Sequence, residues 1–279
     1  MKITVLIENK SEEELYHEHG LSIHINYQNE NYLLDTGASD QFTKNAEKLK
    51  IKLSEVDAAI LSHNHYDHSS GFQAFFSINQ KAKVYLQKEA QQECYFKVLC
   101  FKSYIGMPKD LLVRYPERFH YLEKSMEIAP GVWLIRHSTK GLALKAKKDH
   151  FYRKVNHHLV PDDLLHEQSL VFEGEDGLVI LNSCCHAGVD HIIEEVKAVL
   201  PNKQIAALIG GFHLMGLRGP TTLSMSKDKI EALAHRILEL GVHKVYTCHC
   251  TGDPAYQILK EYMKEQLTYL KTGDQLELF

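Results

Sequence analysis

The sequence predicts an α/β fold, and three observations support this prediction. Short runs rich in β-branched and aromatic residues alternate with segments whose apolar residues recur at helical spacing. Polar side chains follow several of the apolar runs directly, as expected where strands end at a ligand-binding edge. The chain has 279 residues, of which 44% are hydrophobic and 24% charged, so it can bury a sizeable core.

The first part of the chain opens as a sheet and continues with strands and helices in alternation. The predicted strands are residues 2–9, 22–27, 32–35, 56–61 and 82–86, and the predicted helices begin near Phe42 and Phe72. The polar residues 28–31 predict a hairpin turn, and either Ser39 or Asp40 can cap the first helix.

The segment from about 87 to 167 interrupts this order. We interpret it as an insertion into a single domain of residues 1–279, and we expect it to cover the active-site crevice and to select the substrate. Its basic run, Lys140 to Lys154, is either a solvated face or a rim that attracts an anionic substrate. His157 and His158 face apart on most backbones, so we expect them at the surface.

Regular structure resumes after residue 167. The predicted elements are a hairpin of 169–173 and 178–182, strands at 205–209 and 244–247, and helices at 189–200, 227–240 and 256–267. One histidine follows each of three strands: His186, His213 and His249.

The loop after the buried run 56–61 supplies three imidazoles and one carboxylate within six residues. In an extended backbone His63 and His65 point the same way and can bind one ion, whereas Asp67 and His68 diverge as the chain turns. A polar turn with accidental histidines is the alternative. The spacing after a buried strand instead favours two neighbouring metal ions.

The remaining candidate residues lie at other strand ends. Asp35 either caps its own turn or orients a metal-bound histidine from behind. Taken singly, His186, His213 and His249 could be ordinary polar residues. A binuclear centre needs ligands beyond one loop, however, so we expect these histidines to converge on it.

Several motifs of the sequence resemble those of a known family. Asp35-Thr36-Gly37 and His63-x-His65-x-Asp67-His68 resemble the metallo-β-lactamase superfamily, whose fold is a four-layer αββα sandwich. Further motifs resemble the branch often described as dihydropterin-ribofuranosylaminobenzene-phosphate synthase. They are Tyr104 to Pro108, Ala129 to Val132, Glu167 to Leu170, Cys184 to Gly188, Gly210 to Leu214 and His249 to Gly252.

The resemblance implies a ligand set. His63 and His65 would hold the first metal, Asp67 and His68 the second, and His249 would match the last histidine ligand of the superfamily. The usual bridging aspartate is absent, so His186 or Cys184 must substitute, or else His213.

One further ligand histidine of the superfamily lacks a clean counterpart, for which His166 and Glu167 are the nearest candidates. We expect two divalent transition-metal ions. Zinc is the first choice, and manganese and iron suit nitrogen and oxygen ligands as well.

The chemistry expected from such a centre is hydrolysis. Two cations that share a water lower its pKa from about 15.7 towards about 7. The candidate catalytic residues are Asp67, His213, which could donate a proton, and Asp35. The substrate would be an ester, lactone or phosphoester. The alternatives are a synthase that acts on a phosphorylated ribofuranosyl or pterin-type substrate, and a binding module without turnover.

The composition favours some classes of binding partner and one cellular compartment over others. A formal net charge of −4 favours neither nucleic acid nor an anionic membrane, so we expect a small-molecule substrate, possibly anionic. The early acidic residue Glu8 argues against a signal peptide, and we expect a cytoplasmic protein. In that compartment Cys184, Cys185, Cys248 and Cys250 would be thiols near the metals or inert core residues. The oligomeric state stays open.

Overall fold

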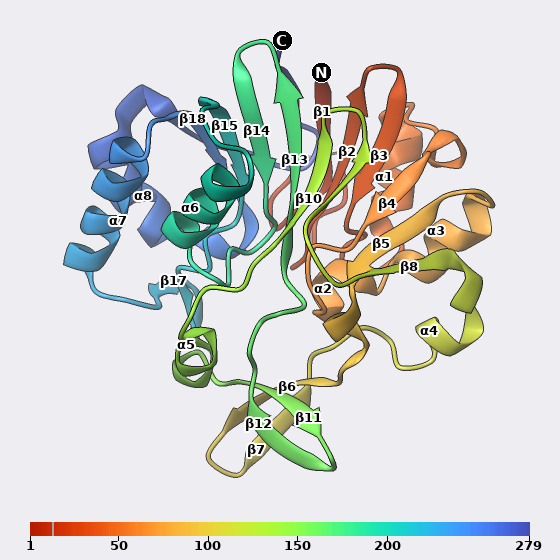
Figure 1. Cartoon of the computed structure of the whole chain (residues 1–279), viewed down its shortest axis with the longest axis horizontal. Coiled ribbons are helices and arrows are strands. Elements are labelled where there is room, and N and C mark those ends of the chain that lie inside the picture. Colours follow the sequence, from red (N-terminus) through yellow and green to blue (C-terminus); the bar gives the residue numbers. More distant parts are fainter. Residues whose placement is uncertain (13) are drawn as a thin grey trace. The chain divides into compact units, whose positions relative to one another are not determined.

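The computed structural model describes residues 1–12 and 14–279, and this part of the chain forms two compact units (Figure 1). The first unit comprises residues 1–124, 136–168 and 271–278, and the second comprises residues 125–135, 169–270 and 279. Each unit contains a seven-stranded sheet and several helices, which confirms the predicted α/β class.

The sheet of the first unit begins with antiparallel strands and ends with parallel ones. Its strands, in spatial order, are β20 (Gln275–Glu277), β1 (Lys2–Ile7), β2 (Ser22–Tyr27), β3 (Glu30–Leu34), β4 (Ala58–Ile60), β5 (Lys83–Gln87) and β8 (Phe119–Leu122). The predicted hairpin joins β2 to β3 through Gln28 and Asn29, whose φ angles of 50° and 66° are typical of a tight primed turn. From β3 to β8 all neighbours are parallel, so their carboxyl ends meet at one edge.

Helices cover one face of this sheet. The helices of the unit are α1 (Gln41–Lys48), α2 (Tyr66–Ser69), α3 (Phe72–Ile78), α4 (Leu111–Arg114) and α5 (Leu142–Lys148), with 3₁₀ turns at Leu53–Glu55, Lys88–Gln91 and Pro116–Arg118. Phe42, Phe72 and Phe75 are fully buried in a core shared with the strands. Asp40 is the N-cap of α1 but makes no side-chain capping hydrogen bond, whereas the hydroxyl of the preceding Ser39 accepts from the N–H of Gln41 at 3.2 Å.

The range that we assigned to an insertion is not one structural block. Its strand β8 belongs to the sheet of the first unit, whereas β9 (Met126–Ala129) and β10 (Val132–Arg136) belong to the sheet of the second. A separate small sheet has the order β12 (His158–Pro161), β11 (Phe151–Val155), β6 (Cys94–Val98) and β7 (Phe101–Tyr104). The role of the segment as a cover over the crevice stays a prediction.

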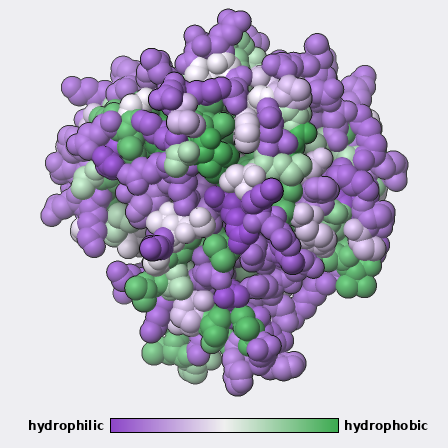
Figure 2. Space-filling view, in the orientation of Figure 1, coloured by the Kyte–Doolittle hydropathy of each residue, from purple (hydrophilic) through white to green (hydrophobic). Residues whose placement is uncertain are grey.

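The small sheet carries exposed apolar residues and the end of the basic run, whose earlier lysines lie on α5. Figure 2 shows apolar side chains at the lower end of the view, where Figure 1 places the β6–β7 hairpin, and Leu99 and Phe101 are exposed there. His157 and His158 lie exposed at the β11–β12 turn, as predicted.

Three of the six lysine and arginine side chains of the basic run lie beside carboxylates. Three ion pairs join Lys145 to Asp149, Arg153 to Asp163 and Lys154 to Glu93. Lys147 and Lys148 are exposed. The surface of this run is therefore less basic than its sequence indicates.

The second unit places three strand ends at one edge of its sheet. The spatial order is β19 (Leu267–Tyr269), β18 (Val242–Thr247), β15 (Ile205–Gly210), β14 (Gly177–Leu181), β13 (Gln168–Gly174), β10 and β9. β14, β15 and β18 are parallel to one another, whereas β13 and β14 form the predicted antiparallel hairpin.

Helices α6 (Val189–Val199), α7 (Lys227–Glu239) and α8 (Asp253–Met263) lie on one side of β14, β15 and β18 in Figure 1. A two-stranded ribbon, β16 (Met215–Gly216) with β17 (Gly219–Leu223), and 3₁₀ turns at His249–Thr251 and Lys264–Gln266 complete the unit. Across the described residues, no helix is long and apolar enough to span a bilayer. The predicted cytoplasmic location stays a prediction.

Candidate metal centre

The candidate site of the first unit lies at the edge where its parallel strands end. Asp35 follows β3 directly, and the loop from Leu61 to Gly71 follows the neighbouring strand β4. The Asp35 N–H donates to the carbonyl of Ile60 at 2.9 Å, which joins the two loops at their start. Asp35 has a φ angle of 58°, a left-handed conformation that is unusual for a non-glycine residue and is concentrated at functional sites.

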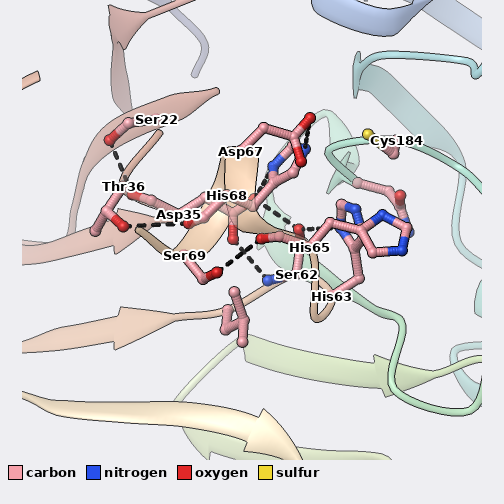
Figure 3. Close-up of polar contacts among 12 residues, drawn as sticks. Ser22, Asp35, Thr36, Ser62, His63, His65, Asp67, His68, Ser69 and Cys184 are labelled. Carbon is pink, nitrogen blue, oxygen red and sulfur yellow. Dashed lines mark hydrogen bonds and ion pairs between the residues drawn. The ribbon is translucent and has the colours of Figure 1, made fainter. Parts of the chain in front are cut away.

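The buried carboxylate of Asp35 accepts three hydrogen bonds (Figure 3). The Ser62 N–H donates to Oδ1 at 2.7 Å, and the Ser62 hydroxyl donates to Oδ2 at 2.6 Å. The Nδ1 of His68 lies 2.8 Å from the same Oδ2, and both side chains are fully buried. An ionised carboxylate only accepts, so His68 must carry its proton on Nδ1.

The Ser62 hydroxyl determines the tautomer of His63 in the same way. Its Nδ1 lies 2.8 Å from the Ser62 hydroxyl oxygen, whose single proton is already given to Asp35. The hydroxyl therefore accepts from the Nδ1–H of His63. In both His63 and His68 the basic lone pair is then on Nε2, the nitrogen that each ring presents away from the Asp35 network.

The donor groups of the loop gather closely. The His63 ring centroid lies 4.3 Å from that of His68 and 4.6 Å from that of His65. The Asp67 Oδ2 lies 3.7 Å from the Nε2 of His68. Burial, reinforced by the neighbouring His166, lowers the pKa of His65 to about 3, so this imidazole is neutral at physiological pH.

His166, which the sequence offered as a possible ligand, contacts the backbone of the loop through one ring nitrogen. The N–H of Asn64, the residue between two candidate ligands, donates to the Nδ1 of His166 at 3.1 Å. On the other side of the ring, Nε2 lies 3.2 Å from the Asp162 carboxylate. The Asn64 side chain meanwhile donates to the carbonyl of Gln92 and accepts from the N–H of Met107. Glu167 is buried beside His166, and its carbonyl accepts from the N–H of His137.

Two residues close to Asp67 and to the loop after β3 were missed from the sequence. The Nε2 of His19 lies 3.3 Å from the Asp67 carboxylate. The carboxylate of Glu18 accepts from the N–H groups of Ala38 and Ser39 and from the Ser39 hydroxyl. The only signal was the polar stretch of residues 17–20 before β2, which we did not consider.

The second unit has its own group of candidate residues. His186, His213 and His249 follow β14, β15 and β18, and the first two rings have centroids 4.3 Å apart. His213 and His249 have left-handed φ angles of 50° and 49°. Such conformations cost free energy and persist where the surroundings require them, which agrees with a functional edge.

A pair of cysteines lies within the same group. The Sγ atoms of Cys184 and Cys250 are 3.4 Å apart. Burial alone would raise the pKa of the Cys250 thiol, but the hydrogen bond with Cys184 and the proximity of His249 and His213 hold that pKa well below its usual range. All six cysteines of the chain lie in the described part, and none forms a disulfide.

The Gly210-Gly211 pair has a packing role that we did not foresee. A Cβ atom on Gly210 would lie 1.8 Å from the carbonyl oxygen of Asn182, and one on Gly211 would lie 2.5 Å from the Cys250 sulfur. The neighbouring chain of the same unit therefore requires both glycines.

The donor groups of the loop from Leu61 to Gly71, which we call the metal loop, fit a divalent transition metal. Three buried imidazoles and a carboxylate are ligands that zinc, manganese and iron accept. A carboxylate that fixes the tautomer of a ligand histidine from behind is the usual support of such ligands. The structure thus gathers Asp35, His63, His65, Asp67 and His68 in the first unit. Their roles as ligands, and those of His186 and His249, stay predictions.

Comparisons with known proteins agree with the fold. The profile of the metallo-β-lactamase superfamily matches residues 18–194. Among curated proteins, the chain is 26% identical to the 7,8-dihydropterin-6-methyl-4-(β-D-ribofuranosyl)-aminobenzene-5'-phosphate synthase of Methanocaldococcus jannaschii, with 92% of this chain and 88% of that protein covered.

Two solved structures extend this agreement. Tm1679, described as a metal-dependent hydrolase of the β-lactamase superfamily, is 30% identical, with a TM-score of 0.81 over 100% of this chain and 99% of its own. Zinc-bound PqqB from Methylobacterium extorquens shares the fold at 12% identity, with a TM-score of 0.62 and both chains fully covered. The predicted fold is confirmed, and the chain belongs to the metallo-β-lactamase superfamily.

Proposed function

We propose that this protein is a metal-dependent hydrolase that acts on an ester, a lactone or a phosphoester. The observation that carries the proposal is the buried Asp35 network, which fixes the Nδ1–H tautomers of His63 and His68 beside Asp67 and His65. A protein that used these histidines only as core residues would not need their basic nitrogens to face away from the buried carboxylate of Asp35.

The proposed ligands follow from this network and from the family. His63 and His65 would bind one divalent ion, and Asp67 with His68 a second. The resemblance adds His249 as a ligand, and His186 would substitute for the missing bridging aspartate. His213, half-buried after β15, would be the proton donor. The ions we propose are two zinc ions, with manganese or iron as substitutes.

Each residue then has a defined task. When bound, such ions would lower the pKa of a bound water towards about 7 and would polarise a carbonyl or phosphoryl oxygen. Asp35 and Ser62 hold two ligand imidazoles in a fixed orientation, so that little reorganisation accompanies the reaction. Burial of His63 and His68 excludes water from behind the ligands. The Asp162–His166 pair holds the backbone of Asn64 between two ligands.

A synthase is the second candidate, because the relative from Methanocaldococcus jannaschii matches over nearly the whole chain. We then expect the substrate to be a phosphorylated ribofuranosyl or pterin-type compound, again a small anionic molecule. The two candidates differ in one measurable respect. A hydrolase releases product from a generic ester, lactone or phosphodiester with water alone, whereas a synthase requires its second substrate.

The first prediction concerns metal content and hydrolysis together. Purified under mild conditions, the protein should carry up to two transition-metal ions per chain and should hydrolyse at least one of a panel of p-nitrophenyl phosphodiesters, esters and acyl lactones. Elemental analysis and product absorbance give the two results. Chelation should abolish turnover and zinc should restore it. Less than about one tenth of an ion per chain, with no uptake on reconstitution, would contradict the proposal.

The second prediction tests the Asp35 network. In the Asp35→Asn variant the new amide donor faces the Nδ1–H of His68 and the Ser62 hydroxyl, so the ligand tautomers lose their support. Metal affinity should fall by about 10- to 100-fold, measured by competition with a chromogenic chelator. Asp57→Asn is the matched control, because Asp57 pairs with Lys81 at the surface of the same unit. Equal affinity in the Asp35 variant and in the control would show that the network does not orient ligands.

The third prediction separates His213 from His249. His249→Ala should lower metal content and turnover together, because an ion loses a ligand. His213→Ala should retain its metal content but lose turnover by about 100-fold or more, the scale of a positioned proton donor. Elemental analysis and kinetics on both variants decide the matter. Loss of metal from the His213 variant would make that residue a ligand and place the missing bridging position on β15.

A further inference from the structure

Two cysteines and one histidine of the second unit form a compact group of metal-binding atoms. Cys184 follows β14, whereas His249 and Cys250 follow β18. One ligand atom from each residue lies within 4.8 Å of the others, and each side chain is at least 96% buried. Within this group, the Sγ atoms of Cys184 and Cys250 lie 3.4 Å apart.

The fold builds this contact from several sides. β14 and β18 flank β15 in a parallel arrangement, so the loops that follow them emerge at the same edge. Gly211 has no side chain where a Cβ atom would lie 2.5 Å from the Cys250 sulfur. The N–H of His213 also donates to that sulfur at 3.3 Å, and such backbone donors stabilise negative charge on sulfur.

The distance between the sulfurs of Cys184 and Cys250 suits one metal ion bound to both. A disulfide requires about 2.05 Å, so the two thiols are not bonded. Two sulfurs 3.4 Å apart, each about 2.3 Å from one zinc ion, would subtend an angle of about 95° at the metal. A slight widening of the contact gives the tetrahedral angle. The imidazole of His249 supplies a third ligand of the type that zinc combines with thiolates.

We propose that Cys184, Cys250 and His249 bind a soft divalent cation of the zinc class through two sulfurs and one nitrogen. This inference rests on the proposed function in one respect, because His249 is a proposed metal ligand in both. It adds the class of metal that a site containing His249 selects. Thiolates favour zinc or iron over manganese and magnesium. Each thiol loses its proton to solvent when the ion binds, so uptake of one ion releases up to two protons.

Cobalt(II) provides the test, because a thiolate bound to cobalt gives an intense near-ultraviolet charge-transfer band that nitrogen and oxygen ligands do not give. Metal-free, reduced wild-type protein is titrated with cobalt chloride, and bound cobalt is measured by dialysis. We expect the band to saturate with the binding of one ion per chain, to lose about half of its intensity in Cys184→Ser and in Cys250→Ser, and to vanish in the double variant. Cys185→Ser and Cys248→Ser are matched controls from the same two loops and should keep the full band.

A second measurement on the wild type avoids any folding defect of the variants. X-ray absorption of the zinc-loaded protein should show sulfur neighbours at about 2.3 Å. Cobalt bound to saturation without the charge-transfer band, or zinc bound to saturation with only nitrogen and oxygen neighbours, would overturn the inference. These results are independent of turnover. Hydrolysis without sulfur ligation would leave the proposed function intact, and sulfur ligation without hydrolysis would contradict only that function.

Discussion

The buried carboxylate of Asp35 is the interaction on which the candidate site of the first unit depends. It is fully buried, and it accepts three hydrogen bonds from Ser62 and His68. A buried carboxylate that lost these donors would be costly, so the hydrogen bonds and the ionised state support each other. The protons of this network decide which nitrogen of His63 and of His68 remains basic. Asp35 therefore links the stability of the loop to its ability to bind a cation.

The sheets explain why these residues are neighbours. In each unit, parallel strands bring loops that are distant in sequence to one edge, namely the ends of β3 and β4 in the first unit and of β14, β15 and β18 in the second. The chain turns sharply after these strands, and Asp35, Cys185, His213 and His249 all have left-handed backbones there. Strain of this kind is retained where side chains must be aimed at one place.

Much of this could be predicted from the sequence because it depends on local patterns. Strand and helix periodicity and the hairpin turn at Gln28 follow from nearest neighbours, and the spacing His63-x-His65 points to the loop whose imidazoles the structure gathers. The role of Ser62 could not be predicted, because a serine in a turn has many possible partners and only the folded chain brings it to Asp35. The same applies to His19 beside Asp67 and to Asp162 behind His166.

The sheet that each strand of the inserted segment joins could not be predicted, for a related reason. Strand β8 and the pair β9 and β10 are short, and their sequences do not show which sheet each edge strand joins. The packing role of the Gly210-Gly211 pair could not be predicted, because the space beside a glycine is visible only after its neighbours are placed. Packing between distant segments, rather than local preference, decided both cases.

The central claim is that the metal loop is organised before any ion binds. The most direct measurement is nitrogen-15 NMR of metal-free protein labelled at histidine, with the His63 and His68 rings assigned by single substitution. Two-bond correlations in each ring report which nitrogen carries the proton. The account predicts that both rings are neutral and protonated at Nδ1, with Nε2 basic. Rings protonated at Nε2, or an averaged mixture of the two tautomers, would contradict it.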